Sequence, residues 1–180
     1  MVGWGALLTV IGGPVLLMTW VRTPWVTLEG ERVDQPVAFD HRHHVRDDGI
    51  DCRYCHYDAE RSAHAGMPET AVCMGCHSQV WTESPLLEPV RRSWFERSPI
   101  RWRHVTLVPD FVYFDHHVHV RSGVPCERCH GRVDLMASVY QATPMDMGFC
   151  LDCHRDPERH FDVPRGLDVH PPVHCTGCHR

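Results

Sequence analysis

The longest apolar stretch lies at the N-terminus, where residues 2–21 carry no charged side chain. About twenty apolar residues are the length that an α-helix needs to cross a bilayer. Trp4, Trp20 and Trp25 lie near its two ends, as in the aromatic belts of membrane helices. Pro14 is expected to kink this helix, which membrane helices tolerate.

A cleaved signal peptide is the alternative interpretation of this stretch. The stretch is long for a signal peptide, no charged segment precedes it, and no A-x-A-like cleavage site follows it. We therefore expect residues 1–25 to form a single membrane anchor helix that is retained, followed by a second domain over residues 26–180.

The middle of the chain predicts one longer helix. Ser84 and Pro85 can start it as N-cap and first helical residue, Pro89 interrupts it, and Ser98-Pro99 ends it. The run from Val108 to Phe114 is extended in character. We expect three aromatic residues of this region to pack on a cofactor or in a small core, namely Trp94, Phe95 and Trp102.

Cysteine usage changes the picture of the second domain. All ten cysteines belong to five Cys-x-x-Cys-His motifs, and they are Cys52, Cys55, Cys73, Cys76, Cys126, Cys129, Cys150, Cys153, Cys175 and Cys178. Two cysteines at this spacing reach the two vinyl groups of one haem, and the next histidine can bind its iron. Zinc sites and disulfides do not require a histidine after every pair. The motifs predict five covalently bound haem c groups, with the proximal iron ligands His56, His77, His130, His154 and His179.

The charge balance supports no nucleic-acid partner. The formal net charge is −5, and all 18 basic residues are arginine. Haem propionates would make the protein more negative still, which disfavours binding to a polyanion. We expect several arginines to form bidentate pairs with propionates.

An internal repeat appears when the motifs are aligned. Phe39 precedes Cys52 by 13 residues, and Phe114 precedes Cys126 by 12. The two motifs within each copy start 21 and 24 residues apart. We therefore expect repeat one at 39–77, a connector at 78–113, repeat two at 114–154 and a terminal haem segment at 155–180.

Each repeat begins with a Phe-Asp-His-x-x-His unit that can supply distal iron ligands. Histidines three residues apart lie on the same side of a helix and can bind two different irons. The expected distal ligands are His41, His44, His116 and His119, whereas His43 and His117 are spectators. For the fifth iron we favour Met147, because methionine is a known haem ligand. The alternatives are His64, His104, His170 and His174.

The expected fold class is mostly α-helical and irregular, with one N-terminal transmembrane helix and a compact haem-packed domain with little sheet. Short helices should surround each motif. With about thirty residues per haem, the porphyrins must supply most of the buried apolar surface.

Several segments resemble a known family. Asp-Gly-Ile-Asp-Cys-Arg-Tyr-Cys-His ends at His56, and Pro-Asp-Phe-Val-Tyr-Phe-Asp-His ends at His116. Together with Met-Gly-Phe-Cys-Leu-Asp-Cys-His they resemble the pentahaem cytochrome subunit of bacterial alternative complex III, a quinol:cytochrome c oxidoreductase, over about residues 37–155 and the last motif. The Phe-x-His-x-x-His units are also similar to those of cytochromes c3 and c7, where both histidines are distal ligands.

The resemblance implies a set of partners. These are an integral membrane quinol-oxidising subunit, an iron–sulfur subunit, a monohaem cytochrome c and, in some assemblies, a terminal oxidase. The segment between Cys153 and Cys175 is short for the family, which leaves the surroundings of the fifth haem open. The domain should lie on the periplasmic side of a bacterial inner membrane, because bacteria attach haem c outside the cytoplasm.

These observations predict a non-catalytic electron-transfer subunit that relays electrons through five haems from a quinol-oxidising complex to a monohaem cytochrome c or an oxidase. A free-standing membrane-anchored quinol dehydrogenase feeding a periplasmic reductase is the alternative. It would need an acid–base residue beside the anchor, and residues 2–21 offer none. A multihaem reductase enzyme is disfavoured, because eleven histidines outside the motifs leave many candidates to close each iron.

Overall fold

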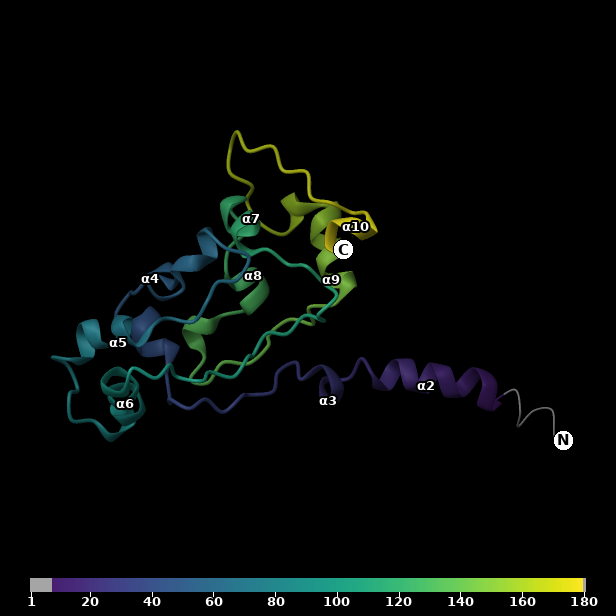
Figure 1. Cartoon of the computed structure of the whole chain (residues 1–180). Coiled ribbons are helices and arrows are strands. Elements are labelled where there is room, and N and C mark those ends of the chain that lie inside the picture. The colour runs from purple at the N-terminus through teal and green to yellow at the C-terminus, as the bar shows by residue number, and fades with distance from the viewer. Residues whose placement is uncertain (1–7, 180) are drawn as a thin grey trace.

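The computed structural model describes residues 8–179 as short helices joined by irregular segments (Figure 1). The first half contains η1 (Leu8–Gly12), α2 (Gly13–Trp20), α3 (Pro24–Thr27), η2 (Arg42–Asp47), α4 (Cys52–Cys55), η3 (Tyr57–Glu60), α5 (Thr70–His77), η4 (Pro85–Leu87) and α6 (Glu88–Glu96). The second half contains α7 (His116–Arg121), α8 (Glu127–His130), η5 (Val133–Leu135), α9 (Met147–Arg155), η6 (Pro157–Arg159) and α10 (Cys175–Cys178). Strand pairing among residues 8–179 is limited to two isolated bridges, Glu29 to Gln141 and Arg32 to Tyr140. The prediction of a mostly helical and irregular chain with little sheet is therefore confirmed.

The region of the expected anchor contains the π-helical turn η1 and the helix α2, which projects away from the motif-bearing part (Figure 1). Within residues 8–179, no helix is both long enough and apolar enough to cross a membrane. Residues 1–7 of the expected anchor lie outside the described residues.

Each of the five motifs lies on a short helix, as predicted, and aspartates begin three of the helices around them. The Asp51 carboxylate accepts a hydrogen bond from the Arg53 backbone N–H at the start of α4, at 2.8 Å. Asp146 does the same for α9, and Asp115 for the ligand-donor helix α7. A carboxylate at the N-cap satisfies an otherwise unpaired backbone N–H, so these helices begin at positions fixed by sequence.

The connector helix is interrupted near Pro89, as predicted, whereas the segment after it differs from its prediction. The expected helix is divided into η4 and α6, with the break before Pro89, and it ends where Arg97 adopts a left-handed conformation. The segment Val108–Phe114 is not a plain extended run, because the Val112 N–H donates to the Pro109 carbonyl and closes a turn.

Very little apolar surface is buried by the polypeptide itself. Among the described residues, the buried hydrophobic side chains are Val37, Val90 and Met136. The accessible surface is 13470 Å², about half as much again as the roughly 9,000 Å² expected for a globular protein of this mass. Trp94 and Phe95 were expected to pack on a cofactor or in the core, but the polypeptide leaves much of each side chain uncovered, and their exposed fractions are 45% and 76%. The described residues, 8–179, therefore do not by themselves form the core of a domain of this size.

Candidate haem sites

The ten cysteines form no disulfide. Each motif places both thiols on one helical turn, with its histidine at the end of that turn or just beyond it. This arrangement leaves two sulfur atoms and one imidazole on each of five short elements.

Histidine rings face each other in pairs across gaps of similar width. The ring centroids are 6.1 Å apart for His44 and His77, 6.2 Å for His116 and His130, and 5.9 Å for His119 and His154. A metal–nitrogen bond of about 2 Å on each side, with about 1 Å from nitrogen to ring centre, separates two opposite imidazoles by about 6 Å. Each pair joins one predicted distal with one predicted proximal histidine. The spacing therefore fits one iron between each two rings.

The remaining distal candidate, His41, lies next to the first motif. Burial and, to a smaller extent, the nearby imidazole of His56 together lower its pKa to about 4. In both repeats, the first histidine of the donor unit thus lies by the first motif and the second faces the histidine of the second motif.

A hydrogen bond at Nδ1 orients most of these rings. Nδ1 donates to a backbone carbonyl in His44 (Asp40, 3.0 Å), His56 (Gly66, 3.0 Å), His77 (Val80, 3.1 Å), His116 (Ala63, 2.8 Å), His119 (Asp115, 2.7 Å), His154 (Pro172, 2.8 Å) and His179 (Phe111, 3.0 Å). A carbonyl can only accept, so the proton is on Nδ1 and the Nε2 lone pair is left for a metal. A second-shell bond of this kind is typical of metal-binding histidines.

Two rings depart from this rule. Nδ1 of His130 lies 3.4 Å from the Thr106 hydroxyl rather than a carbonyl. Nδ1 of His41 is buried without a partner among the described residues. These differences could not be read from sequence, because Thr106 and His130 are 24 residues apart and only the tertiary structure brings them together.

Burial keeps several of these imidazoles neutral. It lowers the pKa of His130 to about 4, with smaller contributions from the charges of His116 and His56, and it also lowers the pKa of His119. The neutral imidazole is the form that binds a metal. The donor set of thiols and neutral imidazoles therefore fits haem c.

Other histidines are engaged with carboxylates instead. His43 pairs with Asp47 at 3.0 Å, His117 with Asp115, His160 with Asp152 at 3.2 Å, and His170 with Asp168 at 2.9 Å. His43 and His117 are the two positions within the donor units that sequence assigned as spectators. A histidine whose ring nitrogen binds a carboxylate on the same surface is an ordinary polar contact.

The fifth motif has a different environment. Among residues 8–179, no histidine ring faces His179 in this way, and the ring beside it is Phe111, with centroids 5.8 Å apart. Met147 is 69% exposed at the start of α9. One turn later, Cys150 lies near enough to Cys178 for Cys178 to raise the pKa of its thiol, in addition to the larger effect of burial. The four alternative ligands are all exposed, namely His64, His104, His170 and His174.

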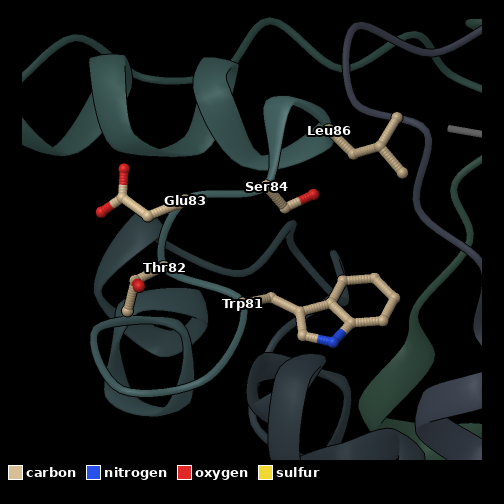
Figure 2. Close-up of a pocket in the computed structure, with 5 residues that line it drawn as sticks. All are labelled: Trp81, Thr82, Glu83, Ser84 and Leu86. Carbon is tan, nitrogen blue, oxygen red and sulfur yellow. The ribbon is translucent and has the colours of Figure 1, made fainter.

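A hollow of about 540 Å³ opens beside the second motif, and sequence did not predict it. Figure 2 shows its lining residues, with the indole of Trp81 on one side and Leu86 on another. Trp81 follows Val80, whose carbonyl accepts the hydrogen bond from His77. The hollow therefore adjoins the proximal histidine of the second motif, and the exposed indole of Trp81 forms part of its lining.

Comparison with known proteins agrees with this donor set. Residues 112–180 match the model of the family "Cytochrome c7 and related cytochrome c", whose members carry covalently bound c-type haem. The "Menaquinone reductase, multiheme cytochrome c subunit" of Nitratidesulfovibrio vulgaris is 35% identical in an alignment of 174 residues that covers 82% of this chain and 77% of the relative. The chain therefore belongs to the family of multihaem cytochromes c, of the cytochrome c7 type, that includes the cytochrome subunit of this menaquinone reductase.

Proposed function

We propose that the chain binds five haem c groups and relays electrons between a membrane quinone-reactive complex and a second redox protein. The observation that carries this proposal is the set of facing histidine rings about 6 Å apart. Two imidazoles on one iron give a low-spin, closed site suited to electron transfer rather than to substrate binding.

Four irons are held between two histidines each in this proposal. The pairs are His41 with His56, His44 with His77, His116 with His130, and His119 with His154. When bound, the haems supply the redox-active sites between which electrons tunnel. The polypeptide holds seven of the ligand rings at fixed orientation through the Nδ1 hydrogen bonds. Burial lowers the pKa of His41, His119 and His130, which favours the neutral, metal-binding form of these three rings.

For the fifth iron, we propose His179 as proximal and Met147 as distal ligand. The proximity of Cys150 to Cys178 supports it, because Met147 lies one helical turn before Cys150. Methionine ligation gives a charge-transfer band in near-infrared magnetic circular dichroism of the ferric protein. Loss of that band in Met147→Leu is expected, and a wild-type spectrum without it would contradict the assignment.

The proposed setting is a bacterial inner membrane, with residues 1–25 as anchor and residues 26–180 on the periplasmic side. The proposed partners are an integral quinol-oxidising subunit and an iron–sulfur subunit, with a monohaem cytochrome c or a terminal oxidase as acceptor, as in alternative complex III. The exposed apolar side chains of α2, among them Val15, Leu16 and Trp20, support the anchor.

The opposite direction of electron flow is the second candidate. The relative is a subunit of a menaquinone reductase, and its name describes electrons delivered to a quinone. A row of haems whose irons each have two axial ligands can carry electrons in either direction. The relay through this protein is therefore the same in both candidate functions. The potentials of the partners decide between them.

One experiment tests both points. The complex is purified in mild detergent, and its haems are mixed with menaquinol or, after reduction, with menaquinone. Reduction by quinol with the partner subunits present supports the first direction, and oxidation by quinone supports the second. A chain that purifies alone and reacts fully with quinol would contradict the complex.

A further inference from the structure

The two repeats contact each other through equivalent elements. The turn η3, directly after His56, packs on α7, which carries the ligand donors of repeat two. In return, the turn η5, shortly after His130, packs on η2, which belongs to the donor unit of repeat one. In each repeat, the segment that follows the first motif in sequence thus packs against the helix that carries the distal-ligand histidines of the other repeat.

Hydrogen bonds fix the first of these contacts. The backbone N–H groups of His116 and His117 donate to the carbonyls of Ala63 and Ser62, at 3.1 and 3.2 Å. Nδ1 of His116 donates to the same Ala63 carbonyl at 2.8 Å. A ligand of the second repeat is therefore oriented by the backbone of the first repeat.

The first motifs of the two repeats are neighbours as a consequence. The Cys52 thiol lies near enough to Cys126 to raise the pKa of the Cys126 thiol, which burial also raises. His56 likewise lies near enough to His130 to lower the pKa of the His130 imidazole, which burial lowers most. The second motif of each repeat lies on the outer side of this centre. In repeat one, Cys73 lies near enough to Cys55 to raise the pKa of its thiol, and in repeat two Cys153 does so for Cys129, in both cases in addition to the larger effect of burial.

The fifth motif follows the fourth. Nδ1 of His154 donates to the carbonyl of Pro172 in the terminal segment at 2.8 Å, and Cys150 lies beside Cys178. Figure 1 shows the five motif helices in the corresponding succession across the molecule: α5, α4, α8, α9 and α10.

We propose that the chain places its attachment motifs in the spatial order second, first, third, fourth, fifth, so that the electron route has its two ends at the second and fifth motifs. The order differs from the sequence order because the repeats join through their first motifs. This inference rests on the proposed function and names its route. When an electron moves one step along the route, the site that gives it up is oxidised and the next site is reduced.

Nuclear magnetic resonance of the fully reduced, diamagnetic holoprotein tests this order without any variant. Each haem is assigned through its own cysteine and histidine protons. Nuclear Overhauser contacts are expected between the haem on Cys52 and the haem on Cys126. Absence of these contacts, or contacts between the haem on Cys73 and those on Cys126 or Cys150, would overturn the order.

Ligand variants give an independent measurement. Methionine in place of a distal histidine raises the potential of that haem, which can then be reduced alone. In His44→Met, reduction of the altered haem should change the electron paramagnetic resonance signal of one other haem, since the second motif is terminal. In His41→Met it should change two. His43→Met is the matched control and should leave all potentials unchanged.

The outcomes separate the two proposals. Fewer than five haems, or loss of the histidine pairs, would refute the proposed function. If the wild type has five haems, four of them between histidine pairs, the order alone would be refuted by two magnetic neighbours of the altered haem in His44→Met, or by one in His41→Met.

Discussion

Substitution of His116 tests the assignment of distal ligands most sharply, because the neighbouring His117 provides a matched control. His116 faces His130 with the two rings almost parallel, at 6°, whereas His117 contacts Asp115 instead. In His116→Ala, the iron at the third motif should lose its sixth ligand. We expect one of the five haems to become high-spin. The ferrous variant should then bind one more equivalent of carbon monoxide per protein than the ferrous wild type.

The structure also gives the cost in stability. The substitution removes the Nδ1 hydrogen bond to Ala63, which is worth about 1 kcal/mol, and part of the packing between the repeats. We expect a loss of about 2 kcal/mol in total. His117→Ala removes a half-exposed pair with Asp115, which costs at most about 1 kcal/mol.

The assays are the visible and electron paramagnetic resonance spectra, carbon monoxide titration and thermal unfolding of both variants. A His116→Ala protein that stays entirely low-spin would refute the ligand assignment. A His117→Ala protein that becomes high-spin would refute it equally.

Three further perturbations have expected outcomes. Gly131→Ala should destabilise the holoprotein by about 2–4 kcal/mol in thermal unfolding, because its φ is +68° and the new Cβ would lie 2.6 Å from Ala142 Cβ. Gly49→Ala, at φ +69° with open space around it, should lower the free energy of unfolding by only about 1–2 kcal/mol. Equal losses of stability in the two variants would contradict the expected clash between the new Cβ at position 131 and Ala142. Thr106→Val removes the hydroxyl near His130 Nδ1 and should raise the midpoint potential of one haem by roughly tens of millivolts. Thr106→Ser keeps a hydroxyl and should leave that potential unchanged. An unchanged potential in both variants would show that the hydroxyl does not tune that iron. Protein made without haem should show little stable structure by circular dichroism, and a native-like spectrum would refute haem as the core.

Local sequence patterns predicted the motif helices and the donor units well. Cysteine spacing and the Phe-Asp-His-x-x-His units depend on residues a few positions apart, and these form short helices capped by Asp51, Asp115 and Asp146. The low sheet content followed from the same density of motifs. The division of the connector at Pro89 was also visible in sequence, although the turn at Pro109 was not.

Longer-range features could not be predicted. The carbonyls that orient the imidazoles belong to segments as distant as Phe111 from His179, and backbone acceptors have no residue preference. The contact of α7 with η3 joins residues more than fifty positions apart, and no side-chain pattern marks it. The environment of His179, without a facing histidine among the described residues, likewise follows from tertiary structure rather than from the motif.

Haem stoichiometry is the most direct test of the central claim. Intact mass spectrometry of the denatured protein, combined with iron and pyridine haemochrome analysis, measures covalently bound haem per chain. The account predicts five haems on every chain, each retained after denaturation and each linked through the two cysteines of its motif. Four or fewer haems in fully matured protein, or zinc in place of iron, would contradict it.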